Sequence, residues 1–141
     1  MRKQNPITKL MKAEKINQEF NTDWFEPSEY ELRLYYGLLN KYVFRGMLTK
    51  PKLELLRLRG AWGIFTGDYY GRPTISMTNR FPTKQFFVMA LAHEMVHQHQ
   101  WDIIGPKQLK EGKKPSINHG PTFYNWRDTL SKFGIPLTAK Y

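Results

Sequence analysis

The chain has 141 residues, a net charge of +10 and no cysteine. Its length suits a single domain over residues 1–141, and the lack of cysteine excludes disulfides, thiol nucleophiles and cysteine-ligated zinc. The N-terminus lacks the apolar run of a signal peptide, and the most apolar stretch, FFVMALA, is too short to span a bilayer. We therefore expect a monomer in the cytoplasm or at the nucleoid or nucleus, neither secreted nor held in a membrane.

The positive charge is concentrated in the middle of the sequence. Residues 32–92 carry ten basic and two acidic side chains, whereas residues 1–31 carry five basic and six acidic ones. A concentrated positive field attracts phosphate backbones and other acidic polymers. Contact with nucleic acid is one explanation of this pattern, and charge spread over a surface for solubility is the other.

The first third of the chain predicts two helices. Apolar residues at helical spacing predict one helix over residues 6–20, within an N-terminal helical extension that covers residues 1–26. The core is expected over residues 27–141. Pro27 suits the first turn of the second helix, which is expected to end near Gly46.

Residues 52–78 predict a sheet. Three short segments rich in β-branched and aromatic residues are separated by Gly60 and by the run GDYYG, which indicates a small antiparallel three-stranded sheet. The alternation of apolar residues slips at Leu55–Leu56, which predicts a bulge. In a strand of period two, Arg57 and Arg59 would point to one face.

Aromatic residues in the same region have two interpretations each. Tyr69 or Tyr70, in the turn GDYYG, could hydrogen-bond an oxyanion, although a place at the rim of the turn is the favoured interpretation. Trp62 and Phe65 could stack on bases beside the arginines, although ordinary packing on the sheet is favoured.

The last third of the chain predicts two further helices and a loop. The segment after Pro82 has helical periodicity over residues 83–100. Residues 102–118 contain two glycines, two prolines and four lysines and are expected to form a loop. Pro121 is expected to start a helix that Gly134 ends.

The predicted helix 83–100 carries the pentapeptide HEMVH, which matches the H-E-x-x-H pattern of zinc peptidases. His93 and His97 are one helical turn apart, so both imidazoles can reach one ion. Glu94 is rotated by about 100° from His93, beside the ion, where it can act as general base for an activated water. Neutral imidazoles and an open fourth position favour Zn²⁺. The alternative is a core helix that happens to carry two histidines.

A catalytic zinc site needs a third protein ligand. Glu111 lies among lysines in a predicted loop, and Asp102 and Asp128 are the remaining carboxylates after the motif. His119 is the preferred candidate, because it follows the loop and directly precedes a helix start in HGPTF. His99 is two positions after His97 and so points to a different face, which indicates a surface or supporting role.

HEMVH followed by HGPTFYNW resembles the SprT-like family of zinc metalloproteases, which includes the Spartan proteases of DNA–protein crosslinks. The upstream segments LNKYVFRGMLTKPKLEL, RLRGAWGIF and TISMT are similar to the family's order of helix and small sheet before the motif helix. The resemblance covers about residues 30–140. It implies an α+β, zincin-like metalloprotease domain in which helices pack on the sheet and one helix carries the motif.

The resemblance also implies the roles of individual residues. His93, His97 and His119 would bind Zn²⁺ and Glu94 would be the catalytic base, with a protein as substrate and DNA, single-stranded or partly so, as activator or platform. Family members often carry a second zinc module with cysteines; with no cysteine here, we expect no C-terminal zinc ribbon. The candidate nucleic-acid contacts are basic side chains from the sheet region and the predicted loop: Arg57, Arg59, Arg72, Lys107, Lys110, Lys113 and Lys114.

Three hypotheses follow from the sequence. The first is a zinc-dependent protease that acts on DNA-associated or DNA-crosslinked proteins. The second is a non-catalytic, basic nucleic-acid-binding module in which zinc only braces the fold; a fourth ligand at His99 or Asp102 would favour it. The third is a general peptidase that does not depend on DNA and whose basic surface binds acidic proteins.

Overall fold

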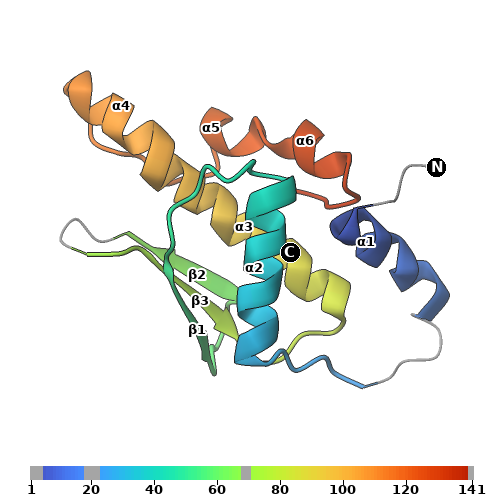
Figure 1. The fold of residues 1–141 in the computed structure, drawn as a ribbon. Coiled ribbons are helices and arrows are strands. Elements are labelled where there is room, and N and C mark those ends of the chain that lie inside the picture. The colour runs from blue at the N-terminus through green and yellow to red at the C-terminus, as the bar shows by residue number, and fades with distance from the viewer. Residues whose placement is uncertain (1–4, 18–22, 68–70, 140–141) are drawn as a thin grey trace.

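The computed structural model describes residues 5–17, 23–67 and 71–139, and Figure 1 shows their arrangement. The protein is an α+β fold, which confirms the predicted class. In chain order its elements are α1 (Pro6–Asn17), α2 (Glu29–Tyr42), β1 (Lys52–Leu56), β2 (Gly63–Thr66), β3 (Thr74–Thr78), α3 (Lys84–His99), the π-helix η1 (Gln100–Ile104), α4 (Gly105–Lys110), α5 (Pro121–Tyr124) and α6 (Arg127–Ser131). None of the described helices combines the length and apolarity needed to cross a bilayer.

Helix α2 begins at a capping box. The Ser28 hydroxyl accepts a hydrogen bond from the Glu31 backbone N–H at 3.1 Å, and Glu31 Oε1 accepts one from the Ser28 backbone N–H at 3.2 Å. These two bonds satisfy donors that the first turn of a helix leaves unpaired. The apolar stripe of α2 then buries Leu32 and Leu39 against the core.

The sheet is mixed, so the predicted all-antiparallel sheet is wrong. Strand β3 lies in the centre, parallel to β1 and antiparallel to β2. The physical reason is burial: four of the five residues of β3 are buried, and a strand covered in this way takes the central place with a partner on each edge. Strand β1 therefore cannot pair with β2, and the connection over residues 57–62 leads to the far edge of the sheet.

The end of β1 also differs from the prediction. Its five residues pair one to one with β3, so there is no bulge at Leu55–Leu56. The strand ends at Leu56, which leaves Arg57 and Arg59 exposed in the connection to β2. They are not held on a common strand face, because strand periodicity stops before them.

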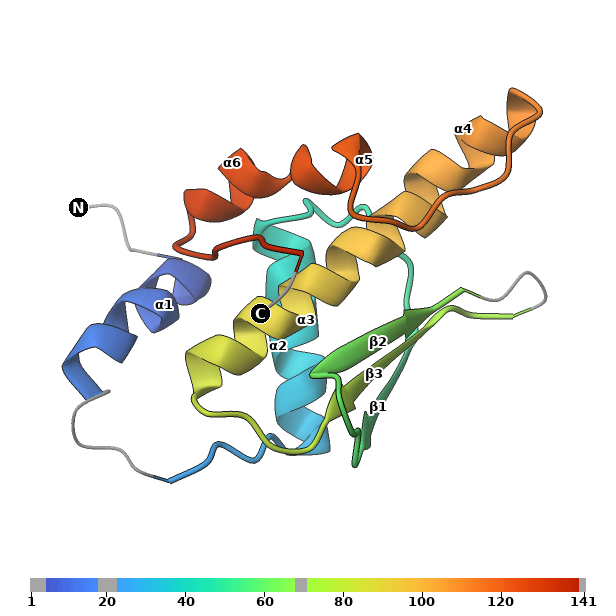
Figure 2. The same cartoon turned by 180° about the vertical axis from the view of Figure 1, so that it is seen from behind.

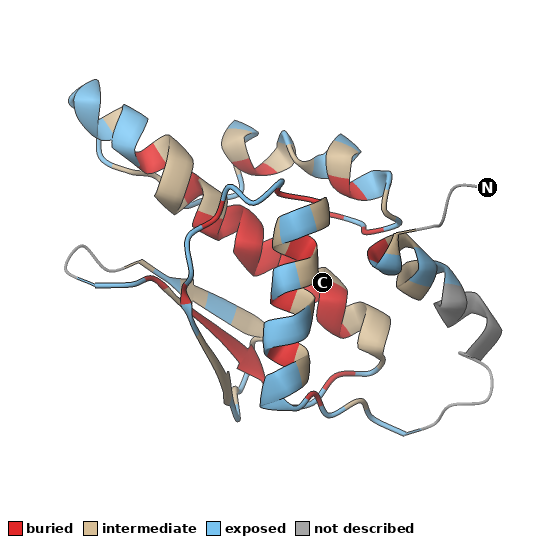
Figure 3. Ribbon diagram, viewed as in Figure 1, coloured by how far each residue is buried: buried red, intermediate tan, exposed pale blue. Residues whose placement is uncertain are grey.

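Helix α3 is the central element of the core. It begins at Thr83, whose hydroxyl accepts a hydrogen bond from the Phe86 backbone N–H at 3.0 Å. Figure 3 shows that most of α3 is buried, and Figures 1 and 2 show α2 and α3 on one side of the sheet. The core of α3 includes Phe87, Leu91 and Met95, all fully buried, so the motif residues lie on a helix that is covered on most sides.

The prediction of a loop over residues 102–118 is wrong for the first half of this segment. Helix α3 continues through η1 into α4 and projects from the body of the molecule (Figures 1 and 2). Pro106 does not break this course, because it lies in the first turn of α4, where a helix does not need its N–H. We call residues 100–118 the arm: η1 and α4 lead outward, and residues 111–118 return.

The return segment is fixed along the outgoing helix. The backbone N–H of Lys113 donates to the Gln108 carbonyl at 2.8 Å, and that of Ser116 donates to Gln108 Oε1 at 3.0 Å. Gly112, with φ of 75°, makes the turn between the two halves. The arm is therefore an ordered hairpin rather than an open loop.

The predicted helix after Pro121 is divided in two. Helix α5 ends at Tyr124 and α6 starts at Arg127, and the turn between them directs Trp126 toward Phe44, with ring centroids 4.6 Å apart. Gly134 has φ of 80° and ends the helical region, as predicted. Beyond it, Ile135 and Leu137 are buried in the core.

Gly67→Ala is expected to lower the free energy of unfolding by about 1–3 kcal/mol, because overpacking distorts its neighbours. A Cβ atom at Gly67 would lie 2.6–2.8 Å from ring atoms of Trp101, which packs η1 on the end of β2. Urea unfolding measures the change. The control is Gly37→Ala in α2, where nothing lies within 4 Å and stability should rise by up to about 1 kcal/mol. Equal effects of the two variants would contradict the close packing of Trp101.

Candidate metal centre

Three imidazoles converge beside helix α3. His93 and His97 are four residues apart on α3, and His119 reaches them from the end of the arm, directly before α5. One ring nitrogen from each lies within 4.8 Å of the others, and the ring centroids are 5.0–5.2 Å apart. His93 and His97 are buried, and His119 is exposed. The structure thus brings together the three predicted ligands as a group that can hold a metal ion.

One pair of ring nitrogens has a separation that suits binding to a shared ion. His93 Nε2 and His119 Nε2 are 3.3 Å apart. Two nitrogens bound to one tetrahedral zinc at about 2.05 Å lie about 3.3 Å from each other. The same separation also fits an N–H···N hydrogen bond. The pair is therefore set at a distance that either a proton or a metal ion can bridge.

Phe123 packs against all three histidines. Its ring centroid lies 4.9 Å from that of His93, 5.2 Å from that of His97 and 4.7 Å from that of His119, and the side chain is fully buried. Because Phe123 is on α5, four residues after His119, the helix that follows the third histidine also supports the first two. Phe123 is thus a core residue that also contacts the site.

Burial keeps the histidines of α3 neutral. It lowers the pKa of His93 to about 3, with smaller lowering contributions from the charges of His97 and His119 and an opposing hydrogen bond with the backbone of Thr138. Burial also lowers the pKa of His97, against the opposing effect of its hydrogen bond to Gln100. A metal ligand must offer a nitrogen lone pair, so neutral imidazoles at pH 7 suit metal binding.

Glu94 lies next to the cluster on the buried side of α3. Its side chain is only 4% exposed and packs against β2 at Gly63, where an added Cβ atom would lie 3.0 Å from Glu94 Cγ. A glycine at this position of the strand therefore makes room for the side chains of Glu94 and Met77. The sequence predicted Glu94 as a site residue, but not the contact with Gly63, which depends on the fold.

A cavity of about 560 Å³ opens over the cluster. The three histidines and Glu94 line it together with residues 60–65, from the β1–β2 connection and β2. Ala139, near the C-terminal end of the described chain, also contributes. None of residues 60–65 was predicted as part of the site, because no local signal links a strand to a helix that follows 30 positions later.

Two alternative ligands are engaged elsewhere. His99 Nδ1 accepts a hydrogen bond from Trp126 Nε1 at 3.3 Å, and burial lowers the pKa of His99. Asp102 Oδ2 accepts hydrogen bonds from the backbone N–H and the hydroxyl of Thr49, each at 2.9 Å. Both residues therefore have supporting contacts, and the histidine group has three members within the described part of the chain. His99 is half-buried rather than a surface residue.

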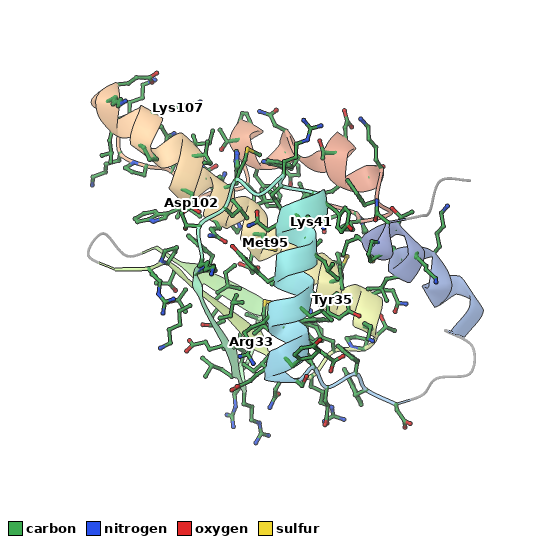
Figure 4. All side chains as sticks on the ribbon, viewed as in Figure 1. Arg33, Tyr35, Lys41, Met95, Asp102 and Lys107 are labelled. Atoms are coloured by element: carbon green, nitrogen blue, oxygen red, sulfur yellow. The ribbon has the colours of Figure 1, made fainter. Side chains whose placement is uncertain are left out.

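The basic residues that were predicted to contact nucleic acid lie in two separate regions of the molecule. Lys107 and Lys110 on α4 and Lys113 and Lys114 on the return segment are all exposed on the projecting arm, where Figure 4 labels Lys107. Arg72 precedes β3, at the end of the sheet on which the base of the arm packs through Trp101 and Gly67.

The other two arginines lie elsewhere. Arg57 and Arg59 follow Leu56, which pairs with Thr78 at the opposite end of β3. The seven basic residues therefore do not form one patch; the four lysines of the arm do share one element.

The predicted aromatic contacts have different outcomes. Trp62 packs on Phe81 and Phe86, with ring centroids 5.7 and 4.9 Å apart, which confirms packing on the fold as its role. Tyr69 and Tyr70 lie outside the described residues.

Neither a scan against protein-family models nor a search of curated proteins found a match for this chain. A function for the protein is therefore inferred from the arrangement of side chains at the histidine cluster and from the surfaces next to it.

The metal-free protein is expected to lose stability as the pH falls from about 6.5 toward 3. Unfolded His93 takes up a proton near its ordinary pKa of 6.5, whereas the folded side chain does so only near pH 3. The unfolded state thus binds more protons in this window, and acid favours it. Replacing His93 by asparagine should reduce proton uptake on unfolding at about pH 5 by close to one proton.

Urea unfolding in the presence of a chelator, at several pH values between about 4.5 and 8, measures this uptake as the slope of the free energy of unfolding against pH. Above about pH 7.5 the two proteins should have the same slope, because His93 is neutral in both states there. Identical slopes at pH 5 would show that His93 titrates normally in the folded protein.

Proposed function

We propose that this protein is a zinc-dependent peptidase of the zincin, SprT-like type that acts on DNA-associated or DNA-crosslinked proteins. One observation carries the proposal: three converging imidazoles and a buried glutamate line a cavity that is also lined by an edge strand. The resemblance of HEMVH and HGPTFYNW to the SprT-like family supports the same conclusion.

The donor set favours zinc over other common ions. Neutral imidazoles suit Zn²⁺, whereas Mg²⁺ and Ca²⁺ prefer oxygen ligands. Three protein ligands leave a position open, as in catalytic zinc sites, whereas structural sites are usually closed by four. His93, His97 and His119 would hold the ion, and when bound it supplies Lewis-acid activation of water and of a carbonyl group.

Glu94 is the proposed catalytic residue. Its carboxylate lines the cavity beside His93 and His97, within the space where water and substrate would meet. A carboxylate in this place can take a proton from the attacking water and deliver it to the leaving amine as the peptide bond breaks. Its position against Gly63 limits its movement, which keeps the proton acceptor near the cluster.

Strand β2 offers a binding edge for a polypeptide. Among the strands that the structure describes, it pairs only with β3, on one side, and its residues Gly63, Ile64 and Phe65 line the cavity. An extended peptide can add to such an edge through backbone hydrogen bonds, which places a peptide bond near the cluster with little demand on side chains. Ile64, at 44% exposed, would then contact the substrate.

The arm is the proposed contact with DNA. It carries four exposed lysines within eight residues, and Glu111 is the acidic residue among them. Lys113 is 3.6 Å from Glu111, but both side chains are largely exposed, so this pair contributes little. Because the arm directly precedes His119, DNA bound to it would be held on an element that leads to the cavity, and a protein attached to the DNA could reach the cavity from there.

Two other functions fit parts of the site. A non-catalytic module with structural zinc would need a fourth protein ligand, and the described contacts of His99 and Asp102 favour an open position instead. A general peptidase independent of DNA would use the same cluster and β2, so cleavage assays with and without single-stranded DNA distinguish it.

Glu94→Gln is expected to keep zinc bound and to lower the rate of peptide cleavage by at least about 100-fold, because the amide cannot accept the proton of water. The measurement pairs metal content of the purified protein with cleavage of a DNA-binding protein in the presence of single-stranded DNA.

His119→Ala is the matched variant for this test. It should lose zinc, because it removes a ligand, whereas Glu94→Gln should not. Full cleavage by Glu94→Gln would exclude Glu94 as the base, and unchanged zinc content in His119→Ala would exclude His119 as a ligand.

A Lys110→Ala, Lys113→Ala double variant is expected to bind single-stranded DNA more weakly and with a weaker salt dependence. Each lost phosphate contact reduces the slope of log affinity against log salt by about 0.7, so the double variant should lose about 1.4. Fluorescence anisotropy with a labelled oligonucleotide, repeated over a range of salt concentrations, measures this slope.

The control double variant changes Lys9 and Lys12 of α1, which are exposed and lie on the opposite side of the molecule from the arm (Figures 1 and 2). It removes the same charge but should leave the slope unchanged. Equal losses in the two variants would assign DNA binding to net charge rather than to the arm.

A further inference from the structure

Gln100 connects two of the three candidate ligands. It is the first residue of η1, its side chain is fully buried, and it lies one helical turn after His97. Its Oε1 is 2.9 Å from His97 Nδ1. Its Nε2 is 2.9 Å from the Asn118 carbonyl oxygen and 2.8 Å from Thr122 Oγ1.

The Asn118 carbonyl fixes the orientation of the amide. A backbone carbonyl only accepts hydrogen bonds, so the NH₂ group of Gln100 must face it. The amide oxygen then faces His97. An amide oxygen also only accepts, so His97 Nδ1 must carry a hydrogen and donate it.

The tautomer of His97 follows from this chain of bonds. In a neutral imidazole a hydrogen on Nδ1 leaves Nε2 with a free lone pair. Hydrogen bonding of the other ring nitrogen is how proteins select which nitrogen of a ligand histidine is available to a metal. Gln100 therefore makes Nε2 of His97 the nitrogen that is available to a metal.

The NH₂ group of Gln100 serves the third ligand. Its two hydrogens are donated to Asn118, directly before His119, and to Thr122, in the first turn of α5. His119 thus lies between two residues, Asn118 and Thr122, that are both hydrogen-bonded to the buried side chain of Gln100. A second constraint comes from Asn118, whose Oδ1 accepts a hydrogen bond from the Gly120 backbone N–H at 3.0 Å.

We infer that Gln100 is a positioning residue that sets the tautomer of His97 and holds the His119 segment against α3, so that both ligands are arranged before a metal binds. The inference rests on the proposed function for the use of the site, since it concerns metal affinity. Its effect on the tautomer of His97 exists without metal and can be measured independently.

Gln98, near the C-terminal end of α3, provides a matched control. It is also a fully buried glutamine, two residues earlier, and its amide bonds with the hydroxyl of Tyr36, the carbonyl of Thr49 and the carboxylate of Asp102. None of these partners belongs to the histidine cluster. If Gln100 mattered only as a buried amide, replacing Gln98 or Gln100 would therefore change zinc affinity to the same extent.

The experiment compares Gln100→Leu and Gln98→Leu with the unaltered protein in a zinc competition titration against a fluorescent chelator. Gln100→Leu is expected to weaken zinc binding by about 10–100-fold, the usual effect of losing a partner of a metal-bound histidine. Gln98→Leu should bind zinc with nearly unaltered affinity. Equal affinities in all three proteins, or equal losses in both variants, would overturn the inference.

A second measurement needs neither a variant nor a metal. Long-range ¹H–¹⁵N spectra of the metal-free protein report which imidazole nitrogen of His97 carries hydrogen, and hydrogen on Nδ1 is expected. Hydrogen on Nε2 would overturn the inference. If the unaltered protein binds no zinc while His97 carries hydrogen on Nδ1, the proposed function fails and the tautomer assignment to Gln100 stands.

Discussion

Three imidazole rings converge with one ring nitrogen of each within 4.8 Å of the others, and like charges brought this close are unfavourable. This constraint governs how the rest of the protein is built. Two protonated rings at the 3.3 Å separation of the His93 and His119 ring nitrogens would repel each other strongly. The fold meets the constraint by placing His93 and His97 on the central helix of the core and by covering the rings with Phe123. The depressed pKa of His93 is thus a result of where α3 lies.

The arm brings His119, which is 22 residues after His97 in the sequence, back to the side of His97. If the intervening residues formed a flexible loop, His119 could occupy many positions relative to α3. Instead η1 and α4 extend the rigid helix, the turn at Gly112 reverses the chain, and the return segment is bonded to Gln108. The position of His119 is then determined by an ordered hairpin whose two ends both lie at the cluster.

The parts that could be predicted from the sequence are those with short-range causes. The pair His93 and His97 follows from helical spacing, and the presence of helices and of a small sheet follows from the periodicity of apolar residues. The order of strands could not be predicted, because it depends on which strand the rest of the protein buries. The arm was missed because Gly105 and Pro106 suggest a break, whereas a proline in a first turn is compatible with a continuing helix. The role of Gln100 was missed because its partners lie 18 and 22 positions away.

The same burial that makes the cluster suitable for a metal has a cost in the metal-free state. His93, Glu94 and His97 take up core positions of α3 where apolar side chains would pack with less desolvation. Any ion that binds the folded protein and not the unfolded chain stabilises the fold in proportion to the logarithm of its concentration over its dissociation constant. Because α3 is both the central core helix and the source of two candidate ligands, the binding of an ion would be coupled to core stability through one element. The Gln100 amide extends this coupling to the arm, since it links the end of α3 to the segment that carries His119.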